Sequence, residues 1–172
     1  MTGKNRSDES PGATLCKSCG LCCTGHLFIW AKLRSAELDN VQALGVKVFR
    51  EPGQRGFSQP CPLWDGVCTI HESPQYPRFC RTYKCKLLKQ VLDDVLPLPS
   101  ALSVVQQTKS LIHELDMLLP THPSPSFRER LVAYLELGGA EPEILQKARE
   151  LLDVYESQFG VTDLLLNPPA NT

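Results

Sequence analysis

The chain has 172 residues, 42% of them apolar, which is enough for the core of one compact domain with a small appendage. Its formal charge at pH 7 is −1, whereas a generic binder of polyanions would be far more basic, so bulk nucleic-acid binding is disfavoured. Eight cysteines are a high number for this length, and all of them lie in the first half of the chain. The sequence therefore predicts a centre built from thiols.

The first residues predict a polar leader. Residues 1–13 include Pro11 and Gly12 and are typical of a disordered segment. They lack the apolar run of a secretory signal, and no stretch of about 20 apolar residues follows that would span a membrane. We therefore expect a cytoplasmic protein with no membrane contact. In that compartment thiols stay reduced, and clustered cysteines bind metal or carry out redox chemistry.

Residues 14–92 hold every cysteine and are expected to form a cysteine-cluster metal-binding domain. The apolar run 27–30 predicts a short strand. Ser35 predicts the N-cap of a helix over about 36–44, and the alternation over 46–49 predicts a second strand.

The end of this domain predicts a hairpin and a helix. Asp65-Gly66 is typical of the turn of a β-hairpin between residues 62–64 and 67–70. Pro77 predicts the start of one helix that runs through Cys80 and Cys85 to about residue 92.

The last part of the chain predicts three helices over residues 100–160, which pack on the cysteine-rich part as a helical extension. Ser100 predicts the first cap, Pro120 the first end, and apolar side chains recur at helical spacing. Residues 167–172 are expected to form a disordered tail. The fold class predicted is α-dominated α+β, with a small irregular metal-bound region, short strands and a three-helix C-terminal part.

The first cysteine motif is Cys16-x-x-Cys19-x-x-Cys22-Cys23. Two residues separate each of the first three cysteines, and a tight turn at this spacing brings sulfurs to one centre, as in zinc knuckles and iron–sulfur cubanes. The side chains of the adjacent Cys22 and Cys23 point in different directions. One could therefore serve a first site while the other serves a second site or remains a buried thiol.

The other four cysteines are more widely spaced. Cys61 and Cys68 flank the expected hairpin, and Cys80 and Cys85 lie five residues apart on the expected helix. Five residues turn a helix by about 500°, so the last two sulfurs would be offset by about 140°. Either the helix is broken between them or they serve different centres.

These motifs resemble a known family. The order of Cys16-x-x-Cys19-x-x-Cys22-Cys23, Cys61-Pro62, Cys68-Thr-Ile-His71 and Pro77-x-x-Cys80-Arg-x-Tyr-x-Cys85 is similar to the bacterial zinc- or iron-chelating domain of the CxxCxxCC, or YkgJ, type, over about residues 14–90. His71 and Tyr76 stand where the family often has Tyr and Arg, and neither departure removes a cysteine. The resemblance implies a metal-binding domain. A similar cluster in a flagellin lysine methylase implies that it can serve an enzyme.

All eight cysteines are candidate metal ligands: Cys16, Cys19, Cys22, Cys23, Cys61, Cys68, Cys80 and Cys85. His26 and His71 each follow a cysteine by three residues, and we expect them on the surface or as hydrogen-bond partners of the site rather than as ligands. The basic residues over 78–89 are expected to partner the thiolates. The usual catalytic motifs are missing from the sequence, so it predicts no substrate and no reaction.

Two functions remain open from the sequence. The first is a metal-binding module with a structural or chelating role, which would be colourless if it held zinc. The second is an iron–sulfur protein with redox or group-transfer chemistry, either an enzyme or an accessory protein, which would be brown. A disulfide-stapled secreted domain ranks third. Metal ions are the expected partners, and a protein partner is left open.

Overall fold

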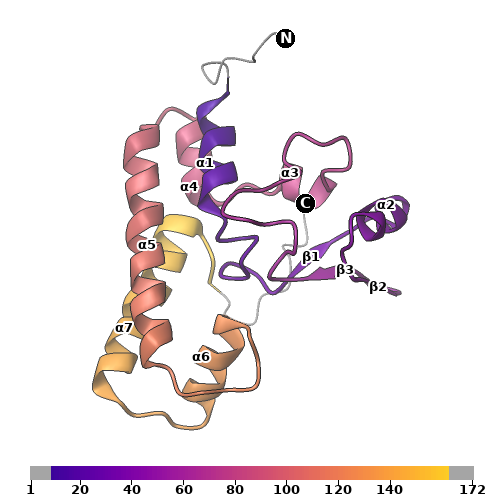
Figure 1. The fold of residues 1–172 in the computed structure, drawn as a ribbon. Helices are drawn as coiled ribbons and strands as arrows, with labels where there is room; N and C mark the ends of the chain where they lie inside the picture. Colours follow the sequence, from indigo (N-terminus) through magenta and orange to yellow (C-terminus); the bar gives the residue numbers. More distant parts are fainter. Residues whose placement is uncertain (1–8, 163–172) are drawn as a thin grey trace.

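The computed structural model describes residues 9–162, in which a cysteine-rich half with a small sheet lies beside a helical half (Figure 1). This arrangement confirms the predicted α-dominated α+β class. The elements of the cysteine-rich half are α1 (Pro11–Cys19), β1 (Trp30–Lys32), the 3-10 turn η2 (Ser35–Glu37), α2 (Leu38–Ala43), β2 (Val48–Glu51), β3 (Gln54–Ser58), α3 (Arg78–Thr82) and α4 (Lys86–Leu92). The helical half contains α5 (Leu98–Leu118), α6 (Phe127–Glu136), α7 (Pro142–Val154) and the π-helical turn η3 (Tyr155–Phe159).

The three predicted C-terminal helices are present as α5, α6 and α7. Helix α5 is the longest element, and α7 packs along it (Figure 1). It begins at Leu98, two residues before the predicted Ser100, because Pro99 fits the first turn, where a backbone N–H has no partner. It ends at Leu118, just before Pro120, as predicted. Within residues 9–162 no helix combines the length and apolar character needed to span a membrane.

Replacement of Ile144 by valine tests the burial of α7 in the core. Ile144 is 5% exposed on α7, and removing one methylene from such a site costs about 1 kcal/mol of unfolding free energy. Leu137 is 86% exposed, so its replacement by alanine is expected to change the same quantity by less than about 0.5 kcal/mol. Urea unfolding followed by circular dichroism measures both. Equal costs for the two variants would contradict the packing described here.

The sheet has the order β1-β3-β2, and both pairings are antiparallel. The strand predicted over 27–30 is wrong except at Trp30, because Leu27 and Phe28 are buried in the core without joining the ladder. The strand predicted over 46–49 is shifted to β2. Strand β3 was not predicted, since its polar residues and Gly56 hide the pattern. An added Cβ at Gly56 would overlap the Ala31 carbonyl oxygen, so glycine is required there for β1 to pair.

Two further predictions need correction. The hairpin around Asp65-Gly66 is reduced to a single bridge between Trp64 and Cys68. The single helix expected from Pro77 to residue 92 is broken into α3 and α4, because Tyr83 is extended, with φ −66° and ψ 127°. The helix expected over 36–44 is present as η2 followed by α2.

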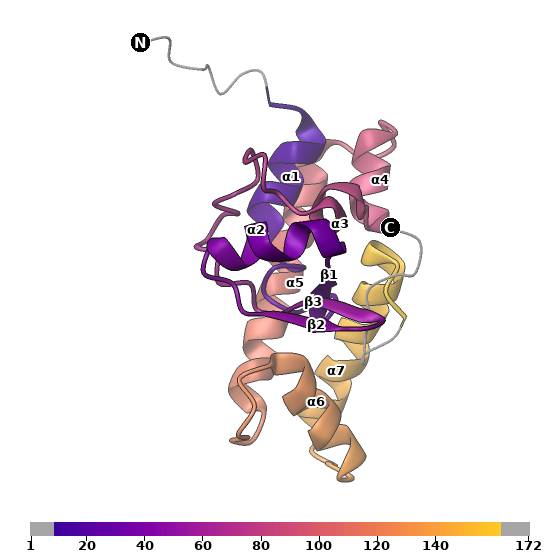
Figure 2. The same ribbon diagram turned by 90° about the vertical axis from the view of Figure 1, so that its right-hand side faces the viewer.

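The beginning of the chain is more ordered than predicted. Residues 11–13 form the first turn of α1, which Ser10 caps by accepting a hydrogen bond from the Ala13 N–H at 3.3 Å, so the expected leader ends earlier. Helix α1 packs against α4 and α5, while the sheet and α2 lie on the other side of it (Figure 2). Residues 1–8 and the expected tail over 167–172 lie outside the described residues.

Candidate metal centre

Helix α1 presents the first two cysteines. Cys16 and Cys19 lie on its last turns, three residues apart and therefore on one face. Gly20 then ends the helix with φ 70°, a left-handed conformation that suits glycine. The chain turns over this glycine, with the Thr24 N–H donating to the Gly20 carbonyl at 2.8 Å. The expected tight turn thus lies after Cys19, and the Cys16–Cys19 step is helical.

The side chain of Trp64 packs against this turn. The Trp64 indole packs so closely on Gly20 that a Cβ there would overlap the ring. Lys109 of α5 places its ammonium group 6.0 Å from the ring centroid and donates to the Ser18 carbonyl at 3.2 Å. The segment between Cys61 and Cys68 is thereby held against α1. Lys109 was not predicted, because only the fold brings α5 to this place.

Backbone contacts bring the other cysteines to the same region. The Cys61 N–H donates to the Cys23 carbonyl at 2.7 Å. Cys80 lies on α3, and its carbonyl accepts a hydrogen bond from the Tyr76 hydroxyl at 3.1 Å. Cys85 is the N-cap of α4, where its sulfur accepts from the Leu88 N–H at 3.4 Å. The break between α3 and α4 lets Cys80 and Cys85 face different neighbours.

Electrostatic repulsion identifies which thiols are neighbours, because the interaction between ionised groups falls with distance. Burial is the main cause that raises the pKa of Cys16 to about 12 and that of Cys19 to about 11, and repulsion from the Cys85 thiolate adds to both. Every pair in one set of four repels in this way. This set, the first thiol group, contains Cys16, Cys19, Cys22 and Cys85.

The remaining four cysteines form a second set. Burial raises the pKa of Cys23 and of Cys80 far above the ordinary range, and repulsion from other thiolates of the set adds to both. Again every pair repels. This set, the second thiol group, contains Cys23, Cys61, Cys68 and Cys80. The two groups are adjacent and interact, since Cys16 also repels Cys23, Cys68 and Cys80, and Cys23 also repels Cys19 and Cys22.

Backbone amides point at sulfurs in both groups. Burial raises the pKa of four of these thiols, and backbone amides two or three residues further along the chain oppose that rise by donating to the sulfur. The four thiols are Cys19, Cys61, Cys68 and Cys85. Hydrogen bonds of this kind stabilise a thiolate and orient it, as the outer partners of a metal ligand do. Two cysteines of each group receive them.

The thiols are close together but not yet arranged around a point. All eight are free and half-buried. Among residues 9–162, no three His, Cys, Asp or Glu side chains stand at the distances of a ready-made metal site. Binding a metal would therefore require the sulfurs to converge by side-chain rotation. The donor set itself fits a thiophilic ion such as zinc or iron, which thiolates bind in groups of four.

His26 and His71 are the two histidines that follow cysteines by three residues. The His26 ring packs against Phe127 of α6 with 5.3 Å between centroids, and the buried Arg128 donates to its carbonyl at 2.7 Å. Burial lowers the pKa of His26 to about 4, so this ring is neutral at pH 7. The His71 ring lies 5.1 Å from the Tyr76 ring. Each histidine therefore contacts an aromatic ring.

Comparison with known proteins bears on the same region. A family model described as "CxxCxxCC: Putative zinc- or iron-chelating domain" matches residues 15–101. This range covers just over half of the 172 residues, contains all eight cysteines and ends in the first turn of α5. No curated protein and no solved structure matches the chain.

Proposed function

Because this chain belongs to the CxxCxxCC family of zinc- or iron-chelating domains, we propose that it is a metal-binding protein whose eight cysteines hold metal in two four-thiolate centres. The first thiol group would hold one centre and the second thiol group the other. The observation that carries the proposal is the gathering of eight free thiols in the matched region, six of which line one inner cavity. The assignment of four thiols to each centre follows from their mutual repulsion. Four thiolates are the complete ligand set of a structural zinc ion.

The position of the two groups supports a structural role. The first thiol group would link the end of α1 to the start of α4, and the second would link Cys23 to α3 and to the segment 61–68. Between Ser58 and Arg78 the described chain has no helix and no strand beyond one isolated bridge. Metal–sulfur bonds would add cross-links to the few hydrogen bonds that hold this segment, so metal binding would stabilise the fold.

An iron–sulfur cluster in the first thiol group is the second candidate. The spacing of Cys16, Cys19 and Cys22, with Cys85 as a distant fourth ligand, is compatible with a cubane. A small cavity of about 60 Å³ lies among the thiols and is lined by cysteines of both groups. Such a cluster would supply electron transfer or group-transfer chemistry to the protein.

Elemental analysis and an absorption spectrum of protein purified without oxygen distinguish the two candidates. We expect about two zinc ions per chain and no visible absorption, given four thiolates per ion. Iron with sulfide, and a broad brown absorption that bleaches in air, would instead establish the iron–sulfur candidate. Protein that binds neither metal after reduction and reloading would refute both.

A further inference from the structure

An open cleft leads from solvent to the thiols. It has a volume of about 590 Å³ and lies between α1, the segment 71–76, α3 and α4. This volume is typical of a small-molecule site and far exceeds the need of a bare ion. Cys16 of the first thiol group and Cys80 of the second line its wall.

The cleft and the small inner cavity share a wall. Cys16 and Cys80 line both spaces, together with Tyr76, Tyr83 and Leu88. The inner cavity is lined in addition by Cys19, Cys22, Cys23 and Cys85. A metal that enters by the cleft would therefore meet Cys16 and Cys80 before it reaches the deeper sulfurs.

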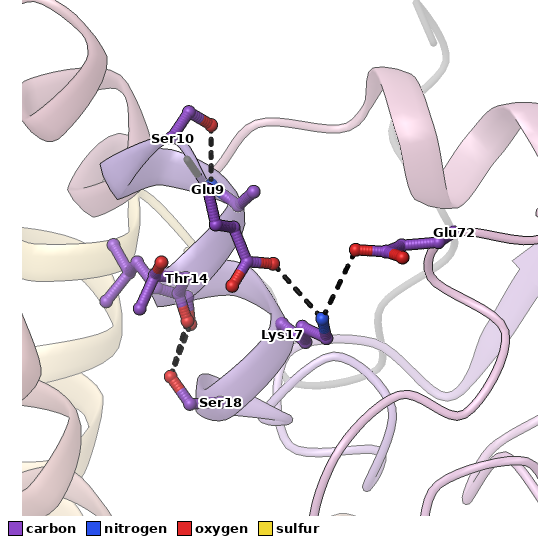
Figure 3. Close-up of polar contacts among 8 residues, drawn as sticks. Glu9, Ser10, Thr14, Lys17, Ser18 and Glu72 are labelled. Atoms are coloured by element: carbon purple, nitrogen blue, oxygen red, sulfur yellow. Dashed lines mark hydrogen bonds and ion pairs between the residues drawn. The ribbon is translucent and has the colours of Figure 1, made fainter. Parts of the chain in front are cut away.

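The charged side chains of the cleft are mainly positive. Arg81 and Lys84 line it, and the Arg81 guanidinium is held 5.9 Å from the Tyr76 ring centroid while it donates to the Tyr76 carbonyl at 3.4 Å. The one carboxylate among the lining residues, Glu72, forms an ion pair with Lys17 of α1 at 3.6 Å (Figure 3). The cleft thus disfavours a bare metal dication and favours an anion.

We propose that this cleft is the place where the protein receives its metal, and that the donor is a small metal complex carrying carboxylate groups. The proposal rests on the metal-binding function proposed above. The carboxylates of the donor bind Arg81 and Lys84, which brings the metal to Cys16 and Cys80. The cleft is large enough for the whole complex, and its positive side chains attract a negatively charged donor.

The transfer is a ligand exchange. The bonds between the metal and the donor oxygens break, and bonds between the metal and the sulfurs form. Each thiol loses its proton to water or to the departing carboxylate, and the oxidation number of the metal does not change. Cys16 then delivers metal to the first thiol group and Cys80 to the second.

Uptake of cobalt by the metal-free full chain tests the proposal, since cobalt–thiolate bonds absorb visible light. Cobalt is offered either as its singly negative nitrilotriacetate complex or as the aqua ion. Replacing both Arg81 and Lys84 by glutamine is expected to slow uptake from the complex about tenfold, because attraction by the cleft is lost. Uptake from the aqua ion is expected to be unchanged or faster. The control replaces Lys32, the last residue of β1, and Lys47, which precedes β2, by glutamine; both are exposed, and neither lines the cleft.

Each outcome of this experiment either supports or overturns the proposal. Slower uptake from the complex alone, with the same final spectrum, supports the proposal. Equal slowing for both cobalt sources, equal slowing in the lysine control, or no slowing at all overturns it. A lower final cobalt content in the Arg81→Gln/Lys84→Gln variant also overturns it, since these side chains would then contribute to affinity rather than delivery. If the unaltered chain forms no cobalt–thiolate absorption from either source, the proposed metal-binding function itself fails.

Discussion

A variant in which Cys22 and Cys85 are both replaced by serine is expected to keep about one metal ion per chain, given four thiolates per ion, while a variant lacking Cys22 and Cys80 keeps none. The first pair belongs to one thiol group and the second pair is divided between the two. Each variant loses two thiols, so a difference in metal content reports only how the thiols are grouped.

The same replacements should cost much of the stability. Zinc bound by structural sites contributes about 10–16 kcal/mol of apparent binding free energy, which is comparable to the total stability of about 5–15 kcal/mol of a typical domain. Loss of one centre is therefore expected to unfold the segments that it joins, and loss of both to unfold the cysteine-rich half.

Elemental analysis gives the metal content, and far-ultraviolet circular dichroism during heating gives the stability. Replacement of the exposed Ser18 by alanine serves as the control, with no change in metal content expected. The grouping is refuted if the Cys22/Cys85 variant loses all metal or if the Cys22/Cys80 variant keeps one ion. Full metal content in both variants would refute cysteine ligation altogether.

Gly20→Ala is expected to show the second large effect. Its φ of 70° costs a residue with a side chain about 1–2 kcal/mol, and overlap of the new Cβ with the Trp64 ring adds about 1–3 kcal/mol. We therefore expect a loss of about 2–5 kcal/mol in unfolding free energy. The displaced indole would also move the segment that carries Cys61 and Cys68, so metal content should fall.

A second glycine separates the two causes. Gly66 has φ 69°, nearly the same as Gly20, but nothing lies within 4 Å of an added Cβ. Gly66→Ala is therefore expected to show the conformational cost alone, about 1–2 kcal/mol, and normal metal content. Guanidinium unfolding of the metal-loaded proteins measures both variants. If they lose the same stability, the Trp64 contact has no energetic importance.

The three C-terminal helices were predicted because local signals mark the ends of helices in this part of the chain. Pro142 opens α7, and Gly160, with φ 72°, ends the helical run that continues through η3. Both residues act through their own backbone preferences, which the sequence shows directly. Strand β3 lacks such a signal, since its pairing with β1 depends on Gly56 accepting the close approach of the Ala31 carbonyl oxygen, and β2 pairs only with β3. Their register was therefore misplaced or missed.

The break between α3 and α4 could not be predicted because it depends on distant contacts. Residues 78–92 have a helical pattern, yet Tyr83 leaves the helix and packs edge-on against Phe28, with 5.3 Å between ring centroids. Phe28 lies far away in sequence. From the sequence alone, the angular offset of Cys80 and Cys85 around a helix was compatible either with a broken helix or with two separate centres. The divergence of Cys22 and Cys23 could be expected from their adjacency alone, and their assignment to different thiol groups is part of the proposal made above.

If each thiol group holds one ion, as proposed, the short chain connections between the groups couple the two binding events. The peptide bond between Cys22 and Cys23 joins the groups directly, and the four-residue link between Cys80 and Cys85 joins them again. Fixing one ion restricts the backbone at both connections, so the second ion has less conformational entropy to remove. The two affinities are then thermodynamically linked and raise each other equally. Singly loaded chains would be scarcer than independent sites allow, and the protein would fill and empty in an almost all-or-none manner.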